Sequence, residues 1–362
     1  MLYLLGVYSE QLQFLKSIYL RTFIGFVLSF IFVLVAGRPF INYLKKKKFG
    51  EEIRENGPSS HYSKKGTPTM GGVLMLLGAI LSILIVGNLQ NKFTILLIIT
   101  TLSFSGIGFI DDYKKFTVNK DGLSGKKKLF GQSLISIMVW VFIKEFGLTS
   151  SKVIDFSICN PIIPDSSFYI GNILMLIFIM LVVTGTSNAV NITDGLDGLA
   201  TMPVIISCAI LGVIAYFSGH IELSTHLNLF SISGSGEIAV FLSSIIGAGL
   251  AFLWYNCYPA QIFMGDTGSL ALGGVIGVIG ILLKQELLIP IIGGVFVMEA
   301  ISVILQVGSY KTRKKRIFRM APIHHHFELM GMPENKVTMR FWILALLCGI
   351  IALGMVRLRG IM

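Results

Sequence analysis

The chemistry of this chain is concentrated in carboxylates that stand next to apolar segments. Asp111 and Asp112 close one apolar segment, Asp194 and Asp197 follow another, and Asp266 opens a third. A charge inside a bilayer is expensive, so ionisable groups gathered at the ends of apolar segments usually mark a functional site. Mg²⁺ is normally held by one or two carboxylates together with waters and substrate phosphates. The pattern therefore predicts a magnesium-dependent membrane site for a phosphorylated substrate, with Asp266 as the metal ligand.

Each carboxylate also has a simpler interpretation that the sequence leaves open. Asp111 and Asp112 could be interfacial acids that end a helix, and Asp266 could be an N-cap. Asp194 and Asp197 would share one face if their segment were helical. The glycines beside them favour instead a loop that lets the backbone approach a ligand closely. Because all of these acids are expected on one face of the membrane, we favour a site.

Two further clusters are rich in hydrogen-bond donors. Lys64 and Thr69 belong to a basic loop with the sequence SKKGTPT, which suits an anionic group or is simply a solvated loop. His324, His325 and His326 follow a run of arginines, and three contiguous histidines rarely bind one metal through all three rings. With cations nearby, they are suited to donate hydrogen bonds to phosphate or sugar oxygens.

The elements that must position these side chains are membrane helices. The 362 residues are 54% hydrophobic and 14% charged, whereas soluble domains carry about 25% charged residues. A span needs roughly 20 mainly apolar residues, and open sheets cannot satisfy their backbone in lipid. We therefore predict an all-α integral membrane fold in a single domain, residues 1–362. Its ten helices are expected near residues 20–43, 70–87, 93–110, 129–146, 170–188, 199–218, 237–255, 265–283, 287–307 and 339–356.

The distribution of positive charge predicts the orientation. Of the 30 Lys and Arg residues, 21 fall within residues 44–69, 111–128 and 308–340, which are expected on one face. The positive-inside rule makes this face cytoplasmic. Because the number of spans is even, both termini are expected outside the cytoplasm and the active site on the cytoplasmic face. Topology and anionic lipid or substrate explain the net charge of +11, so no nucleic acid partner is predicted.

A disulfide-rich or zinc-binding protein and a secreted protein with a cleaved signal both fit the sequence poorly. The four cysteines are scattered without a CxxC pair, which supports neither a disulfide framework nor a zinc site. The first apolar stretch runs into basic residues and is interpreted as a membrane anchor rather than a cleaved signal.

Five runs of residues resemble the phospho-N-acetylmuramoyl-pentapeptide transferase family of the polyprenyl-phosphate N-acetylhexosamine-1-phosphate transferase superfamily. They read SKKGTPTMGG (63–72), DDY (111–113), NAVNITDGLDG (188–198), FMGDTGS (263–269) and PIHHHFE (322–328). The resemblance covers nearly the whole chain. It implies ten transmembrane helices in the bacterial inner membrane, a homodimer and a cytoplasmic Mg²⁺ site. The implied reaction joins UDP-N-acetylmuramoyl-pentapeptide to undecaprenyl phosphate, giving lipid I and UMP, by direct attack or through an aspartyl intermediate.

The resemblance also implies a role for individual residues. Asp111 would deprotonate or orient the lipid phosphate with support from Asp112, and Asp266 would bind Mg²⁺. His325 is the fourth residue predicted to be catalytic. The uridine pocket would be lined by Lys64, Gly195, Leu196, Asp197, Asn256 and Phe263, above a polar floor of Asn191 and Asp194. The sugar phosphate would meet His324, His325 and His326, and the remaining predicted substrate-binding residues are Thr69, Lys128 and Gln306.

Two alternatives compete with this interpretation. A sister transferase that uses UDP-N-acetylglucosamine would share the aspartates, although the HHHFE and TPTMGG runs favour the muramoyl enzyme. An ion-coupled transporter would place its site near the bilayer midplane on broken helices. Nearly all acids here stand at span ends instead. Glu299, inside the ninth predicted span, is the exception, and the sequence assigns it no role.

Overall fold

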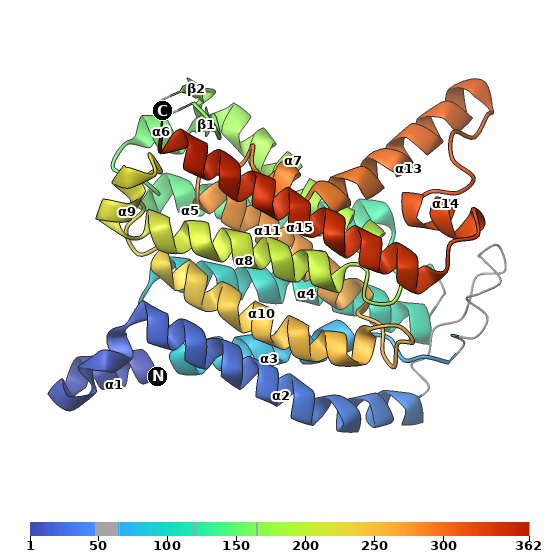
Figure 1. The fold of residues 1–362 in the computed structure, drawn as a ribbon, viewed down its shortest axis with the longest axis horizontal. Coiled ribbons are helices and arrows are strands. Elements are labelled where there is room, and N and C mark those ends of the chain that lie inside the picture. The colour runs from blue at the N-terminus through green and yellow to red at the C-terminus, as the bar shows by residue number, and fades with distance from the viewer. Residues whose placement is uncertain (48–63, 65, 119–120, 164–165, 362) are drawn as a thin grey trace.

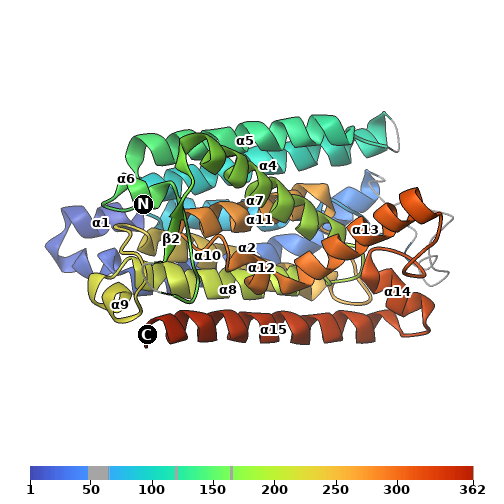
Figure 2. The same ribbon diagram turned by 90° about the horizontal axis from the view of Figure 1, so that it is seen from above.

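The computed structural model is a bundle of helices that run side by side along one axis (Figures 1 and 2). It describes residues 1–47, 64, 66–118, 121–163 and 166–361. The helices in chain order are α1 (Leu2–Tyr8), η1 (Glu10–Lys16), α2 (Ile18–Lys46), α3 (Gly71–Val86), α4 (Lys92–Thr117), α5 (Gly125–Phe146), α6 (Lys152–Asp155), α7 (Gly171–Thr193), α8 (Thr201–Ser218), α9 (Ile221–His226), α10 (Gly236–Asn256), α11 (Gly265–Leu282), α12 (Ile289–Ile292), α13 (Gly294–Arg313), α14 (Ile323–Leu329) and α15 (Glu334–Arg359).

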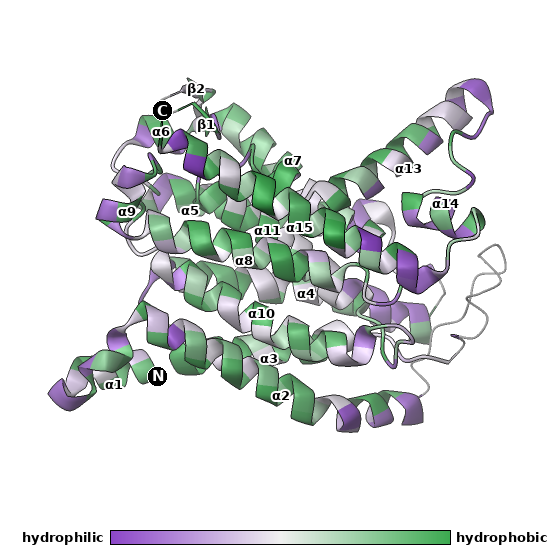
Figure 3. Cartoon of the chain, viewed as in Figure 1, coloured by the Kyte–Doolittle hydropathy of each residue, from purple (hydrophilic) through white to green (hydrophobic). Residues whose placement is uncertain are grey.

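Eight of the described helices are long and apolar enough to cross a membrane: α2, α4, α5, α7, α8, α10, α11 and α15. Helix α3 is also apolar but shorter, with 16 residues. Each of the ten predicted segments contains a helix, although the ninth is interrupted at Gly293, between α12 and α13. Figure 3 shows hydrophobic residues along the helices and hydrophilic residues mainly at the two ends of the bundle. The fold is therefore that of an integral membrane protein.

Helix α11 is the centre of the bundle and packs against α7 and α4. Small residues allow this close packing. A Cβ at Gly273 would lie 2.5 Å from the carbonyl oxygen of Thr186, and one at Gly274 would lie 2.6 Å from the ring of Phe104. Small residues let membrane helices approach each other without a side chain between their backbones. The position of α11 matters because its first turn carries Asp266.

The bundle has two distinct ends (Figures 1 and 2). Both termini lie at one end, together with α6 and α9, and α14 lies at the other end. The connections that carry the predicted polar clusters lie at the α14 end, because the long helices alternate in direction. The residues before Lys64 in the first connection lie outside the described part of the chain.

One small element of the described structure is not helical, and it leaves the all-α class unchanged. Strands β1 (Ser157–Cys159) and β2 (Ser167–Tyr169) form an antiparallel hairpin at the end that carries both termini. Three-residue strands are too short for their alternation to be recognised in a sequence. The hairpin leaves the helical bundle and the predicted site unchanged.

Candidate active site

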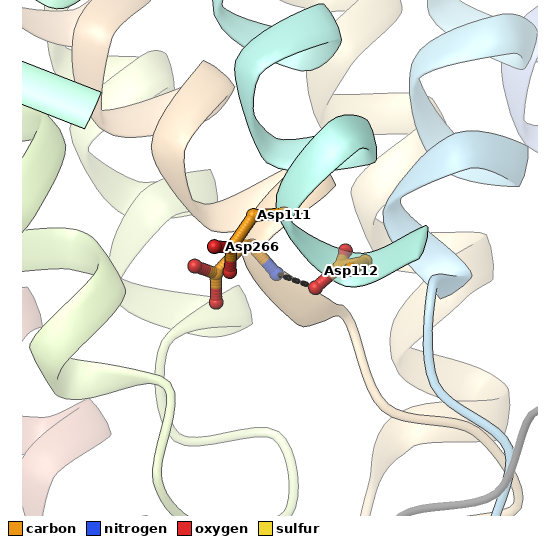
Figure 4. Close-up of side chains that lie close together, drawn as sticks. All are labelled: Asp111, Asp112 and Asp266. Atoms are coloured by element: carbon orange, nitrogen blue, oxygen red, sulfur yellow. Dashed lines mark hydrogen bonds between the residues drawn. The ribbon is translucent and has the colours of Figure 1, made fainter. Parts of the chain in front are cut away.

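Three carboxylates from two helices converge at the α14 end of the bundle. Asp111 and Asp112 lie in the last turns of α4 and Asp266 in the first turn of α11 (Figure 4). One oxygen from each carboxylate lies within 4.8 Å of the others. The helices approach so closely because α4 has a glycine at the crossing: a Cβ at Gly108 would lie 2.2 Å from the carbonyl oxygen of Asp266. The structure thus brings together the three predicted acids.

Asp112 holds the N-terminus of α11. Its carboxylate accepts hydrogen bonds from the backbone N–H of Asp266 (3.1 Å) and from the N–H and hydroxyl of Thr267 (2.9 and 2.7 Å). A carboxylate at a helix N-terminus satisfies free N–H groups and is favoured by the helix dipole. Asp112 therefore fixes the position of Asp266, while the side chain of Asp111 lies beside that of Asp266 (Figure 4).

Two lysines neutralise part of the charge of the aspartate cluster, by which we mean Asp111, Asp112 and Asp266. Lys115 lies 2.7 Å from Asp111 Oδ2 and 3.1 Å from Asp266 Oδ1. Lys128 lies 2.9 Å from Asp111 Oδ2 and 2.5 Å from Asp266 Oδ2. Three carboxylates thus face two ammonium groups. Every atom of the aspartate cluster that could bind a metal is a carboxylate oxygen. This set fits a hard divalent cation such as Mg²⁺.

The segment 194–200 between α7 and α8 is a tight turn, so Asp194 and Asp197 do not share a helix. Asp197 is buried and its carboxylate accepts from Lys64 Nζ at 2.6 Å and from the N–H of Ala260 at 2.9 Å. Leu196 is also buried, and Gly198 has a φ of +70°. We call this segment, with Lys64 and residues 256–263, the nucleotide loop region, after its predicted role.

Asn256 and Phe263 stand at the two ends of the 256–263 segment of this region. Asn256 accepts a hydrogen bond from Thr201 (2.8 Å) and donates one to the carbonyl of Ile262 (2.9 Å). Phe263 donates its N–H to the carbonyl of Pro68 (2.8 Å), and Lys64 Nζ lies 5.9 Å from the centre of its ring. The predicted residues of this pocket are therefore neighbours, although they come from three distant segments.

Other predicted residues bind protein groups around these two areas. Asn191 donates to the hydroxyl of Ser269 at 2.8 Å, linking α7 to α11. Asp194 is the C-cap residue of α7, and Thr69 is buried close to the start of α11. Gln306 accepts hydrogen bonds from the N–H groups of residues 317 and 318, so it orders the segment before α14.

The three histidines have three different environments. His324 is fully buried with its Nδ1 3.1 Å from Glu299 Oε1, His325 Nδ1 lies 2.8 Å from Glu328, and His326 accepts from the N–H of residue 319. The rings of His324 and His325 lie 4.1 Å apart, and each of the three histidines has a different polar partner. His324 also abuts the nucleotide loop region, because a Cβ at Gly195 would lie 2.4 Å from its Nε2.

Some groups in the site were not anticipated. Glu334 accepts hydrogen bonds from Lys64 and from the N–H of Asp197, and Thr267 binds Asp112. Lys115 could have been inferred, because it stands four residues after Asp111 and such residues are neighbours on a helix. No local signal in the sequence identifies Glu334, whose partners are far away along the chain.

Comparison with known proteins identifies a family and a close relative in sequence. The model of the family described as glycosyl transferase family 4 matches residues 94–284, slightly more than half of the chain. A phospho-N-acetylmuramoyl-pentapeptide-transferase of Fusobacterium nucleatum subsp. nucleatum is 64% identical over 362 residues, which is the full length of both proteins. The aspartate cluster and residues 191–263 fall inside the family match, whereas the histidines and Glu334 fall outside it.

Proposed function

Because the chain belongs to the phospho-N-acetylmuramoyl-pentapeptide transferase family, within glycosyl transferase family 4, we propose that it makes lipid I. It transfers phospho-N-acetylmuramoyl-pentapeptide from its UDP derivative to undecaprenyl phosphate and releases UMP. The observation that carries this proposal is the full-length identity of 64%, and the site has the chemistry that the reaction requires. Phosphoryl transfer depends mostly on positioning and on neutralising charge, so it needs carboxylates, a metal and cations together.

The residues of the aspartate cluster have separate tasks in this reaction. Mg²⁺ would supply charge neutralisation on the diphosphate, and Asp266 would hold it. Asp111 orients the phosphate of the lipid acceptor, whose oxygen forms the new P–O bond to the sugar-bearing phosphorus as the bond to UMP breaks. Asp112 keeps Asp266 in place through the N-terminus of α11. Lys115 and Lys128, which already contact Asp111 and Asp266, contribute positive charge beside the transferred group.

The remaining predicted residues bind the donor substrate. Uridine is assigned to the nucleotide loop region, with Gly195, Leu196, Asp197, Asn256, Phe263 and Lys64. Asn191, Asp194, Thr69 and Gln306 support the same substrate, and the histidines of α14 are assigned to the sugar phosphate. The support for this division is spatial: α14 reaches the turn at Gly195 through His324.

The protein is a multi-pass membrane protein, and we propose the bacterial inner membrane as its location. All ten predicted segments would cross the bilayer, α3 and α13 included. The α14 end would face the cytoplasm and both termini would face outward. The clustering of 21 of the 30 Lys and Arg residues in three connections supports this orientation. Two copies would form a homodimer.

The activity is tested by incubating the purified protein with UDP-N-acetylmuramoyl-pentapeptide, undecaprenyl phosphate and Mg²⁺, and following UMP release. UDP-N-acetylglucosamine at the same concentration is the matched control. Preference for the muramoyl donor supports the proposal. Preference for UDP-N-acetylglucosamine would refute it and identify the chain as a sister transferase.

The orientation is tested with single cysteines in a background without the four native ones. Asp121→Cys and Ser231→Cys both place the thiol at an exposed position, at opposite ends of the bundle. An impermeant thiol reagent added outside intact cells should label position 231 and leave position 121 unlabelled. The opposite pattern would reverse the orientation and separate the site from a cytoplasmic nucleotide.

A further inference from the structure

Glu334, in the first turn of α15, contacts two segments of the nucleotide loop region. Its Oε1 accepts a hydrogen bond from Lys64 Nζ at 2.5 Å and another from the backbone N–H of Asp197 at 2.8 Å. The residue is only 7% exposed. Hydrogen bonds to a charged group are stronger than bonds between neutral groups. Glu334 therefore links α15 to Lys64 and to the turn that follows α7 through charge-assisted hydrogen bonds.

The carboxylate of Asp197 completes this arrangement. Its Oδ1 binds the same ammonium of Lys64 at 2.6 Å, and its Oδ2 accepts the N–H of Ala260 at 2.9 Å. Glu334 thus fixes the backbone of Asp197, and the side chain of Asp197 fixes the loop after α10. If Glu334 is removed, Lys64 loses one of its two carboxylates and the turn loses its anchor to α15.

The electrostatics fit a positioning role. Burial alone would lower the pKa of Lys64, but the charges of Glu334 and Asp197 outweigh that effect and raise it. The ammonium is therefore charged at every physiological pH. The stability that the charged Lys64 contributes to the fold is fully present below its unfolded pKa of about 10.4. It is lost only as the pH rises through the higher pKa of the folded state. Two carboxylates around one ammonium also leave no excess positive charge for a phosphate.

We propose that Glu334 is a positioning residue for the uridine nucleotide, acting through Lys64 and Asp197. The inference rests on the proposed function, since it assigns the nucleotide to this region. Glu334 has little exposed surface of its own, so its effect on the nucleotide is indirect. It also lies in α15, outside the residues 94–284 that the family model matches, so a helix beyond that region completes the pocket.

A purely structural role is the competing explanation, because an acidic residue in the first turn stabilises a helix through the dipole. The neighbouring Asn335 is exposed and offers a matched control. Asn335→Glu in a Glu334→Gln background returns a negative charge to the first turn of α15 from a position whose side chain faces solvent. It would restore a dipole effect without restoring the bonds to Lys64 and Asp197.

The experiment measures UMP binding by calorimetry and the KM of both substrates, with the full-length protein in detergent. Glu334→Ala should weaken UMP binding and raise the donor KM by about 10- to 100-fold, while the KM for undecaprenyl phosphate changes by less than about twofold. Glu334→Gln, which keeps an oxygen for the N–H of Asp197, should show a smaller effect of about five- to tenfold. Asn335→Glu should not rescue it. Combined with Lys64→Gln, the effects should be less than additive.

Three outcomes would overturn the proposal: unchanged UMP binding in both Glu334 variants, an equal rise in the KM of both substrates, or rescue by Asn335→Glu. If Glu334→Ala does not fold, the Gln variant and its control decide the question. UMP binding does not depend on transfer. A wild-type protein that binds UMP but does not use the muramoyl donor would therefore contradict the proposed function and leave this test valid.

Discussion

Buried charges occur at both ends of the bundle, but they are arranged differently. At the end with the termini, Arg21 contacts both oxygens of Glu237 at 2.5 and 2.7 Å, with side chains 1% and 7% exposed. Lys284 is paired with Glu286 at 2.5 Å in the same one-to-one manner. At the α14 end, three carboxylates share two lysines that each contact more than one of them.

We expect this difference to separate charges that stabilise the fold from charges that act in the reaction. A buried pair is destabilised when one partner is removed, because the other charge is left uncompensated. In the cluster, by contrast, each lysine contacts at least two carboxylates, so the loss of one carboxylate leaves both ammonium groups paired. Removing one carboxylate from the cluster should therefore damage activity more than stability, whereas removing one from a pair should damage folding. Four substitutions test this contrast.

The largest effect is expected from Asp266→Asn. The change removes a charged metal ligand, and a metal contributes several kcal/mol of charge stabilisation in the transition state. Turnover should fall by about three orders of magnitude, and its dependence on Mg²⁺ should weaken. The melting temperature should change little, because both lysines keep Asp111 as a partner. UMP release across a series of Mg²⁺ concentrations and a thermal melt give the two readouts, and a marked drop in melting temperature would contradict the contrast.

Asp111→Asn should reduce turnover as severely while leaving nucleotide binding intact. The reason is that we assign Asp111 to the phosphate of the lipid acceptor and uridine to the nucleotide loop region. Turnover is measured by UMP release and nucleotide binding by calorimetry with UMP. If UMP binding weakened as much as turnover, the assignment of separate tasks to Asp111 and Asp266 would be wrong.

Glu237→Ala should act on stability instead. It leaves the guanidinium of Arg21 buried without its carboxylate, and such a loss costs about 3–5 kcal/mol. The folded fraction should decrease and the melting temperature should drop, while the KM of both substrates in the surviving protein stays unchanged. The double variant Arg21→Met/Glu237→Leu is the matched control and should recover most of the stability, because an apolar pair leaves no buried charge. A changed KM in folded Glu237→Ala protein would show that the pair influences the site.

The smallest of these effects is expected from His325→Ala. This histidine pairs with Glu328 at 2.8 Å, on the short helix α14. Losing one charge-assisted contact to the sugar phosphate costs about 1.5–3 kcal/mol, or roughly 10- to 100-fold in transfer. Competition by free UMP should change little, because uridine is bound elsewhere. Equal losses in transfer and in UMP competition would place His325 in the uridine pocket.

The sequence alone determined the helical segments and the identity of the aspartates. Hydropathy is a local property, so an apolar stretch is recognisable without knowledge of its neighbours, and each of the ten predicted segments contains a helix. An ionisable group beside such a stretch is recognisable for the same reason, since its burial cost must be compensated. Asp111, Asp112 and Asp266 could therefore be named in advance, and they do converge.

Only the tertiary structure decided how these groups are held. Glu334 binds residues 270 and 137 positions away along the chain, and His324 meets Glu299 from another helix. The turn of residues 194–200, the break at Gly293 and the hairpin of β1 and β2 likewise depend on what packs beside them. Hydrogen bonds and ion pairs depend on distances of a few ångströms between side chains from different helices. The packing of α4, α7, α11 and α15 sets those distances, and no local pattern in the sequence records them.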